Sequence, residues 1–156
     1  MIDASEIVDA FVAALRDIPE LVAEMENEPE RISAYHDHYP KRSSLAMAMH
    51  QMPAPRLMVA WKGTGPGTFG TNDVWKHELT LYLRARSAGE SDGPVYNRLF
   101  RLITRGVPAS AGVPMMQHTI HPDCYPMDAP AIQRATDAEG LDYFEVSVTF
   151  TEIGDA

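Results

Sequence analysis

Two segments of this chain alternate apolar and other side chains with a period of two, which places each set on one face of a β-strand. In residues 141–153 the apolar positions are Phe144, Val146, Val148 and Phe150. In residues 74–86 one face would carry Trp75, His77, Leu79, Leu81 and Leu83. Strands of this kind bury one face and leave the other towards water, so they predict an antiparallel sheet that is covered on one side.

Two more strands would pair with these. Residues 57–61 (LMVAW) are a run of large apolar residues, and residues 132–136 (IQRAT) lead into a turn, DAEG, before the strand over 141–153. Residues 62–73 (KGTGPGTFGTND) contain glycine at 63, 65, 67 and 70 and a proline. We expect a flexible loop there, too long for a tight hairpin, joining 57–61 to 74–86.

Helical patterns precede and separate the strands. Asp3 can cap a helix, and Glu6 lies three residues further on, as in a capping box. The apolar stripe of this helix runs from Ile7 to Ile18. The helix stops at Pro19 or gives way to a short turn there. A second helix begins at Pro94 and ends before Gly106. A short helix is expected over residues 45–52. We expect a helix end and a loop over residues 20–30. Residues 31–44 are polar and mixed in composition. Residues 107–130 are expected to form a loop with a short strand at 115–120.

The predicted fold is therefore α+β: an antiparallel or mixed four-stranded sheet with helices packed on one face, in the order α-(α)-β-β-α-β-β. Residues 1–156 fit a single domain that can bury a sizeable core. A lone cysteine, Cys124, excludes an intramolecular disulfide. The acidic start is unlike a signal peptide, and no apolar run approaches the ~20 residues that span a bilayer. We therefore expect an intracellular protein without a membrane partner.

The net charge of −9 is unevenly distributed. Residues 1–30 carry −8, residues 31–136 carry +5 and residues 137–156 carry −6. The overall charge argues against a dedicated duplex-DNA binder, because phosphate contacts dominate such affinity. The segregation suggests complementary surfaces that meet either within a subunit or between copies.

One group of residues is a candidate for metal binding or for catalysis. His118, His121 and Cys124, with Asp123 between them, are ligand types that zinc accepts. Structural zinc sites pair two such groups, and the second is missing here unless His36 and His38 supply it. A small metal- or thiol-dependent enzyme stays an alternative, but no residue set indicates catalysis, so we expect no catalytic residue, cofactor or metal.

Two other patterns are candidate contact surfaces. The glycine-rich segment resembles a phosphate loop only in composition, because a strand follows it where a helix would be needed. Its candidate residues are Gly63, Gly65, Gly67, Phe69 and Gly70. Arg98, Arg101 and Arg105 line one side of the second long helix, and could contact another subunit, bind nucleic acid or form a solvated face.

In length and element order, over about residues 3–153, the sequence resembles the tail-terminator proteins of long-tailed phages and prophages, also called tail completion or head–tail joining proteins. The segments that carry the resemblance are QMPAPRLMVAW, the glycine-rich loop, VWKHELTLYLRA, VYNRLFRLI and DYFEVSVTFTEIGD.

The resemblance implies a structural, non-enzymatic virion protein, assembled in the host cytoplasm and placed at the head-proximal end of the tail. Its partners would be copies of itself in a hexameric ring, the tail-tube protein and the head-completion or connector protein, with DNA passing through as cargo. By analogy, Gly63, Gly65, Gly67, Phe69 and Gly70 would meet the tube or connector, and Arg98, Arg101 and Arg105 would make ring contacts. Another neck or head-completion protein, or a nucleic-acid-binding module, stays open.

Overall fold

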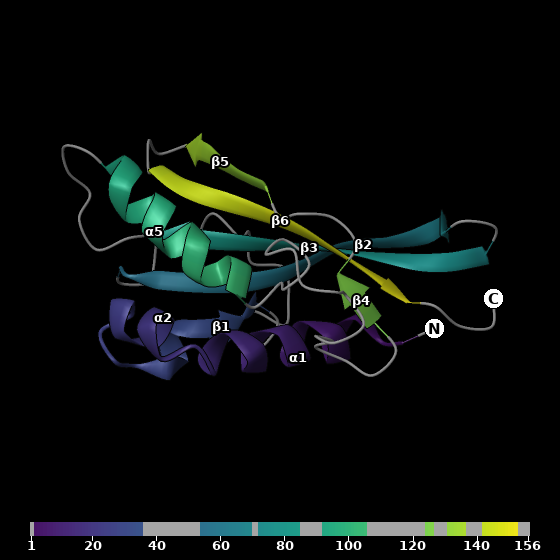
Figure 1. Ribbon diagram of the computed structural model, residues 1–156, viewed down its shortest axis with the longest axis horizontal. Helices are drawn as coiled ribbons and strands as arrows, with labels where there is room; N and C mark the ends of the chain where they lie inside the picture. Colours follow the sequence, from purple (N-terminus) through teal and green to yellow (C-terminus); the bar gives the residue numbers. More distant parts are fainter. Residues whose placement is uncertain are drawn as a thin grey trace.

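The computed structural model describes residues 2–35, 54–69, 72–84, 92–105, 124–126, 131–136 and 142–152. Its strands form a six-stranded mixed sheet in the order β1-β2-β3-β6-β4, with β5 also paired to β6 (Figure 1). Only β1 and β2 are parallel; every other pair is antiparallel. The strands are β1 (Ile32–Ala34), β2 (Arg56–Phe69), β3 (Asn72–Arg84), β4 (Cys124–Pro126), β5 (Ala131–Thr136) and β6 (Asp142–Glu152).

The α+β class is confirmed, and so are the four predicted strands, which correspond to β2, β3, β5 and β6. The count of four strands and the simple element order are wrong, because β1 and β4 were not predicted. Each is only three residues long, too short to show a period. Side chains help to hold β1 beside β2: Arg31 Nη1 donates to the Pro55 carbonyl at 3.0 Å, and Arg56 Nη2 donates to Ser33 Oγ at 2.9 Å.

The prediction of a loop over residues 62–73 is also wrong. β2 continues to Phe69 and β3 begins at Asn72, with Thr64 opposite His77 and Gly67 opposite Val74. A β-bulge between Trp61 and Gly63 accommodates the extra residue, Lys62. Glycines have a low strand propensity on their own, but the ladder to the partner strand holds them extended.

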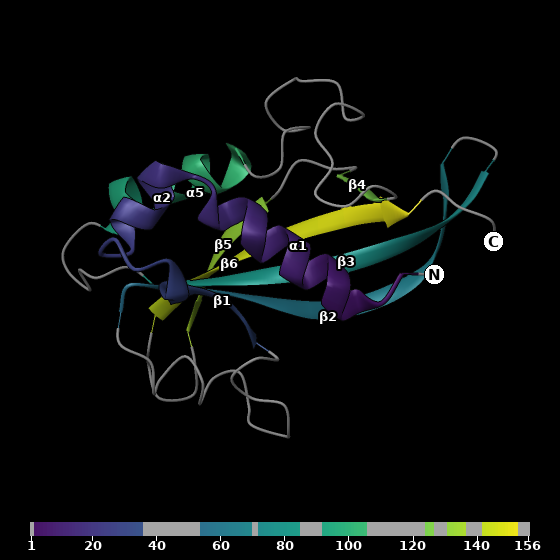
Figure 2. The same ribbon diagram turned by 90° about the horizontal axis from the view of Figure 1, so that it is seen from below.

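The three α-helices of the described residues lie on one side of the sheet (Figure 2). They are α1 (Ala4–Arg16), α2 (Pro19–Glu24) and α5 (Asp92–Arg105), with a 3₁₀ turn, η1, at Pro29–Arg31. Asp3 caps α1 as predicted, since its carboxylate accepts from the Ser5 amide at 2.9 Å. The predicted helix over 45–52 and the predicted strand over 115–120 lie outside the described residues.

The core lies between these helices and the covered face of the sheet. Phe11 of α1 meets Phe150 of β6 edge-on, with ring centroids 5.3 Å apart, and Tyr96 of α5 stacks on Phe144 at 3.7 Å. Among the described residues no helix is both long and apolar enough to cross a membrane. The inward positions of β3 and β6 are those that the alternation predicted: His77, Leu79, Leu81, Leu83, Val146, Val148 and Phe150 are all buried.

The outer halves of β2 and β3 form an arm, defined here as residues 61–69 and 72–78. The arm extends past the end of α1 in both views (Figures 1 and 2). β1 pairs with β2 only as far as Val59, so in the described part of the chain β2 has no second strand neighbour from Ala60 to Phe69. The arm therefore presents an open sheet edge beyond the helical layer.

Candidate functional site

A polar cluster around the buried His77 lies at the base of the arm, on the face towards the helices. His77 of β3 is fully buried, and its Nε2 is 2.9 Å from Glu152 Oε2 at the end of β6. Its Nδ1 is 2.9 Å from Thr64 Oγ1 of β2, which also accepts a hydrogen bond from Trp61 Nε1 at 2.9 Å. We call Trp61, Thr64, His77 and Glu152 the arm-base cluster. It joins β2, β3 and β6 through consecutive hydrogen bonds.

Glu152 also holds the segment that leads into α1. The backbone N–H of Ile2 donates to both carboxylate oxygens, at 2.9 and 3.0 Å. Burial alone would raise the pKa of Glu152, but the hydrogen bonds from Ile2 and His77 favour the carboxylate and bring its pKa below the usual 4.5. The carboxylate thus ties the start of the helical layer to the base of the arm.

The order hydroxyl, imidazole, carboxylate is also that of a nucleophile triad. In this structure the hydrogen bonds of the cluster link three strands, His77 is sealed from solvent, and Thr64 Oγ1 also accepts a hydrogen bond from the indole N–H of Trp61. The alternation placed His77 on the inward face, but nothing in the sequence pointed to its partners, because Thr64 was assigned to a loop and Glu152 lies 75 residues away.

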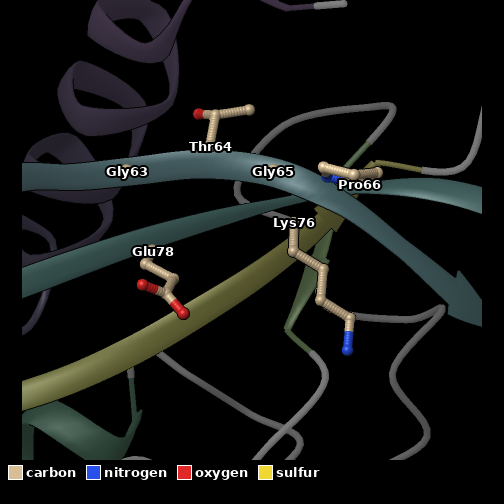
Figure 3. Close-up of a pocket in the computed structure, with 6 residues that line it drawn as sticks. All are labelled: Gly63, Thr64, Gly65, Pro66, Lys76 and Glu78. Carbon is tan, nitrogen blue, oxygen red and sulfur yellow. The ribbon is translucent and has the colours of Figure 1, made fainter.

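The arm also carries a pocket of about 290 Å³. Gly63, Thr64, Gly65 and Pro66 of β2 line it together with Lys76 and Glu78 of β3. Figure 3 shows the Lys76 and Glu78 side chains leaving on one side of the arm, whereas the Thr64 side chain points to the other. Two of the four β2 residues in the lining are glycines, and one amine and one carboxylate from β3 flank them.

The predicted glycine-rich site is thus part of this arm. Gly63, Gly65 and Gly67 occupy alternate positions of β2, opposite Glu78, Lys76 and Val74. They therefore share the face away from the helices. Phe69 is the last residue of β2, opposite Asn72, and Gly70 lies outside the described residues. The expected contact with a tube or connector stays a prediction.

The predicted arginine stripe lies on α5, and one member already has a partner within the subunit. Arg98 forms a two-point ion pair with Glu24 of α2: its Nε is 2.8 Å from Oε1 and its Nη2 is 3.0 Å from Oε2. Arg101 is exposed, and Arg105 ends the helix. The basic and acidic segments therefore meet within one chain at Arg98. A role for Arg98, Arg101 and Arg105 between subunits stays a prediction.

The metal alternative gains no support from the described part of the chain. His118 and His121 lie outside it, as do His36 and His38, and Cys124 begins β4. The described residues contain no group of three metal-ligating side chains.

Comparison of the sequence with models of known protein families and with curated proteins finds no match.

Proposed function

We propose that this chain is a structural protein of a phage virion, a tail terminator that forms a six-membered ring, caps the tail tube and joins it to the head connector. The arm is the observation that carries the proposal. It extends beyond the helical layer, has an edge along β2 that no other described strand covers, and carries Trp61, which is 53% exposed. Open edges and exposed tryptophans are features by which chains recognise other chains.

A ring needs a head-to-tail contact between two different patches of the same subunit. The arm and the helical layer supply two such surfaces at different places in the fold (Figure 2). The α+β subunit with helices on one face is also the architecture that the resemblance to tail terminators implies. The net charge of −9 suits a channel through which DNA passes without being retained.

The assembly state of the purified chain tests this proposal. We expect light scattering to give a particle of about 104 kDa, six times the chain mass of 17.3 kDa, and electron microscopy to show a ring with a central hole. A strict monomer at high concentration in low salt would contradict the proposal.

A variant with a shortened arm provides the matched control. Residues 67–74 would be replaced by Asn-Gly, a turn that closes a two-residue hairpin between Pro66 and Trp75, which are opposite each other. Because the arm-base cluster stays intact, we expect a folded monomer that no longer forms rings. A ring that persists without the outer arm would count against the arm as the contact surface.

A further inference from the structure

The two ends of the arm-base cluster have fixed hydrogen-bonding roles. An indole N–H can only donate, so Trp61 Nε1 donates to Thr64 Oγ1 at 2.9 Å. At the other end, the backbone N–H of Ile2 donates to both oxygens of Glu152, at 2.9 and 3.0 Å. Burial raises the pKa of Glu152, but the hydrogen bonds from Ile2 and His77 bring it below the usual 4.5. At neutral pH Glu152 is therefore a carboxylate, which can only accept.

His77 completes the chain between these ends. Its Nε2 lies 2.9 Å from Glu152 Oε2, and because a carboxylate has no hydrogen to give, Nε2 must carry one. A neutral imidazole carries a single ring hydrogen, so Nδ1 is bare and the Thr64 hydroxyl donates to it across 2.9 Å. Every donor then points towards Glu152, along a chain that runs from the exposed Trp61 to the buried carboxylate.

We infer that His77 is a tautomer switch: the group at Glu152 decides which ring nitrogen carries the hydrogen, and thereby how firmly the exposed Trp61 is held. With a carboxylate there, Trp61 is the only donor to Thr64 Oγ1 among the described residues. With a donor there, Nε2 must accept instead, and the ring stays neutral by exchanging one hydrogen for another with water. Nδ1–H would then compete with Trp61 for the Thr64 oxygen.

The switch connects two places that lie on different parts of the subunit. Ile2 leads into the first helix, whereas Trp61 lies on the arm. Hydrogen bonds that all point the same way polarise and strengthen one another. A contact that draws the Trp61 indole away from Thr64 would therefore weaken the hold on the segment before α1, and the coupling acts equally in reverse. This inference goes beyond the proposed ring and does not depend on it.

The variant Glu152→Gln tests the switch, because the two ends of the new amide have opposite roles. Its oxygen can keep the Ile2 N–H in the place of Oε1, so its NH₂ group faces His77 Nε2 in the place of Oε2. A two-bond ¹H–¹⁵N correlation spectrum at pH 7 shows which ring nitrogen of each of the six histidines carries hydrogen. His77→Gln identifies the His77 signals. We expect hydrogen on Nε2 in the wild type and on Nδ1 in Glu152→Gln.

A second measurement follows the arm. The exchange of the Trp61 indole hydrogen with water should be roughly two- to tenfold faster in Glu152→Gln, the factor that corresponds to the net free energy of one hydrogen bond. Trp61→Phe identifies the signal, and Glu78→Gln, the same change on the other face of β3, is the matched control. Thr64→Val removes the acceptor, so it should speed this exchange by itself and make it insensitive to Glu152→Gln. Thr64→Ser keeps the chain and should behave like the wild type.

The wild-type spectrum alone can overturn the inference. Hydrogen on Nδ1 of His77, or on both of its nitrogens, would do so even if Glu152→Gln failed to fold. Hydrogen on Nε2 in both the wild type and Glu152→Gln would show that the ring does not switch. A tautomer change that leaves the Trp61 exchange unaltered would contradict the coupling to the arm. None of these measurements needs a ring, so a monomer that shows the switch would contradict only the proposed function.

Discussion

A histidine on the apolar face of a strand must have both ring nitrogens bonded, because burial removes them from water. His77 meets this condition through Thr64 on one side and Glu152 on the other. The side chain therefore fixes the position of β2 and β6 relative to β3 at the point where the arm leaves the core. A substitution in this cluster should be felt in the arm as well as in the stability of the subunit.

The variant Glu152→Gln tests the cluster through pH. The folded-state pKa of Glu152 is lowered, so its contribution is present above about 4.5 and is lost as the pH falls through the lower folded value. At pH 7 we expect the variant to lose about 1–3 kcal/mol of unfolding free energy. Urea denaturation from pH 7 to pH 3 should show this difference shrinking below about pH 4.5. Glu78→Gln, which changes an exposed residue on the other face, is the control. A difference in unfolding free energy between the wild type and Glu152→Gln that stays constant with pH would contradict this role of Glu152.

Tyr82 offers a second test, on the face of β3 that points away from the helices. Burial, followed by the carboxylate of Glu145, raises the pKa of Tyr82 from 10 to about 12. The neutral phenol is thus favoured by folding, and its contribution is lost as the pH rises from about 10 towards 12. Ultraviolet titration should show a late-titrating phenol that is lost in Tyr82→Phe and titrates earlier in Glu145→Gln. A titration curve at high pH that is the same in the wild type and in Tyr82→Phe, apart from the smaller amplitude, would refute the assignment.

At the scale of elements, the long alternating patterns predicted β3 and β6 well, because both strands bury one face under helices. β1 escaped notice because its three residues, Ile32–Ala34, are all buried and show no alternation. The sequence predicts a loop for the outer half of β2 because its glycines carry no alternating pattern, and only the register with β3 makes this segment a strand. Tertiary pairing overrides local propensity in both places.

The candidate site was predictable only in part, for the same reason. Gly63, Gly65 and Gly67 could be chosen from composition, but the face that they share follows from their pairing with Glu78, Lys76 and Val74. The arm-base cluster could not be predicted at all, because it brings together residues from three strands and from the segment before α1. Sequence periodicity reports the face of one strand and carries no information about which distant residue lies opposite.

The ion pair between Arg98 and Glu24 joins α5 to α2, and its strength can be measured by a double-mutant cycle. Arg98 is 55% exposed, so the coupling should be about 0.2–1 kcal/mol. We expect Arg98→Gln, Glu24→Gln and the double variant to change stability by no more than this. An assembly defect much larger than the loss of stability would support the predicted contact of Arg98 with another subunit.

At the scale of the whole molecule, the acidic N-terminal helices and the basic α5 lie on the same face of the sheet (Figure 2). Their charges partly neutralise each other at Arg98 and Glu24, so no isolated basic surface is expected from α5. The molecule as a whole stays strongly acidic, with a net charge of −9. Repulsion from phosphate should then dominate any encounter with DNA.

Duplex DNA should therefore not be retained by this protein even at low salt. Electrophoretic mobility shift at low ionic strength is the measurement, with the variant carrying both Arg98→Glu and Arg101→Glu as the control. We expect neither protein to shift the DNA. A salt-sensitive shift by the wild type that the double variant abolishes would favour a nucleic-acid-binding module over the ring.

The bulge at Lys62 changes which residue numbers point inward. Before it, odd-numbered residues such as Leu57 and Val59 face the helices; after it, even-numbered ones such as Thr64 do. If Lys62 occupied a regular position in the ladder instead of the bulge, the glycines would point inward and Thr64 would miss His77. In a relative, a deletion confined to position 62 should preserve both faces of the arm, whereas a single insertion elsewhere between 63 and 69 should invert them from that point on.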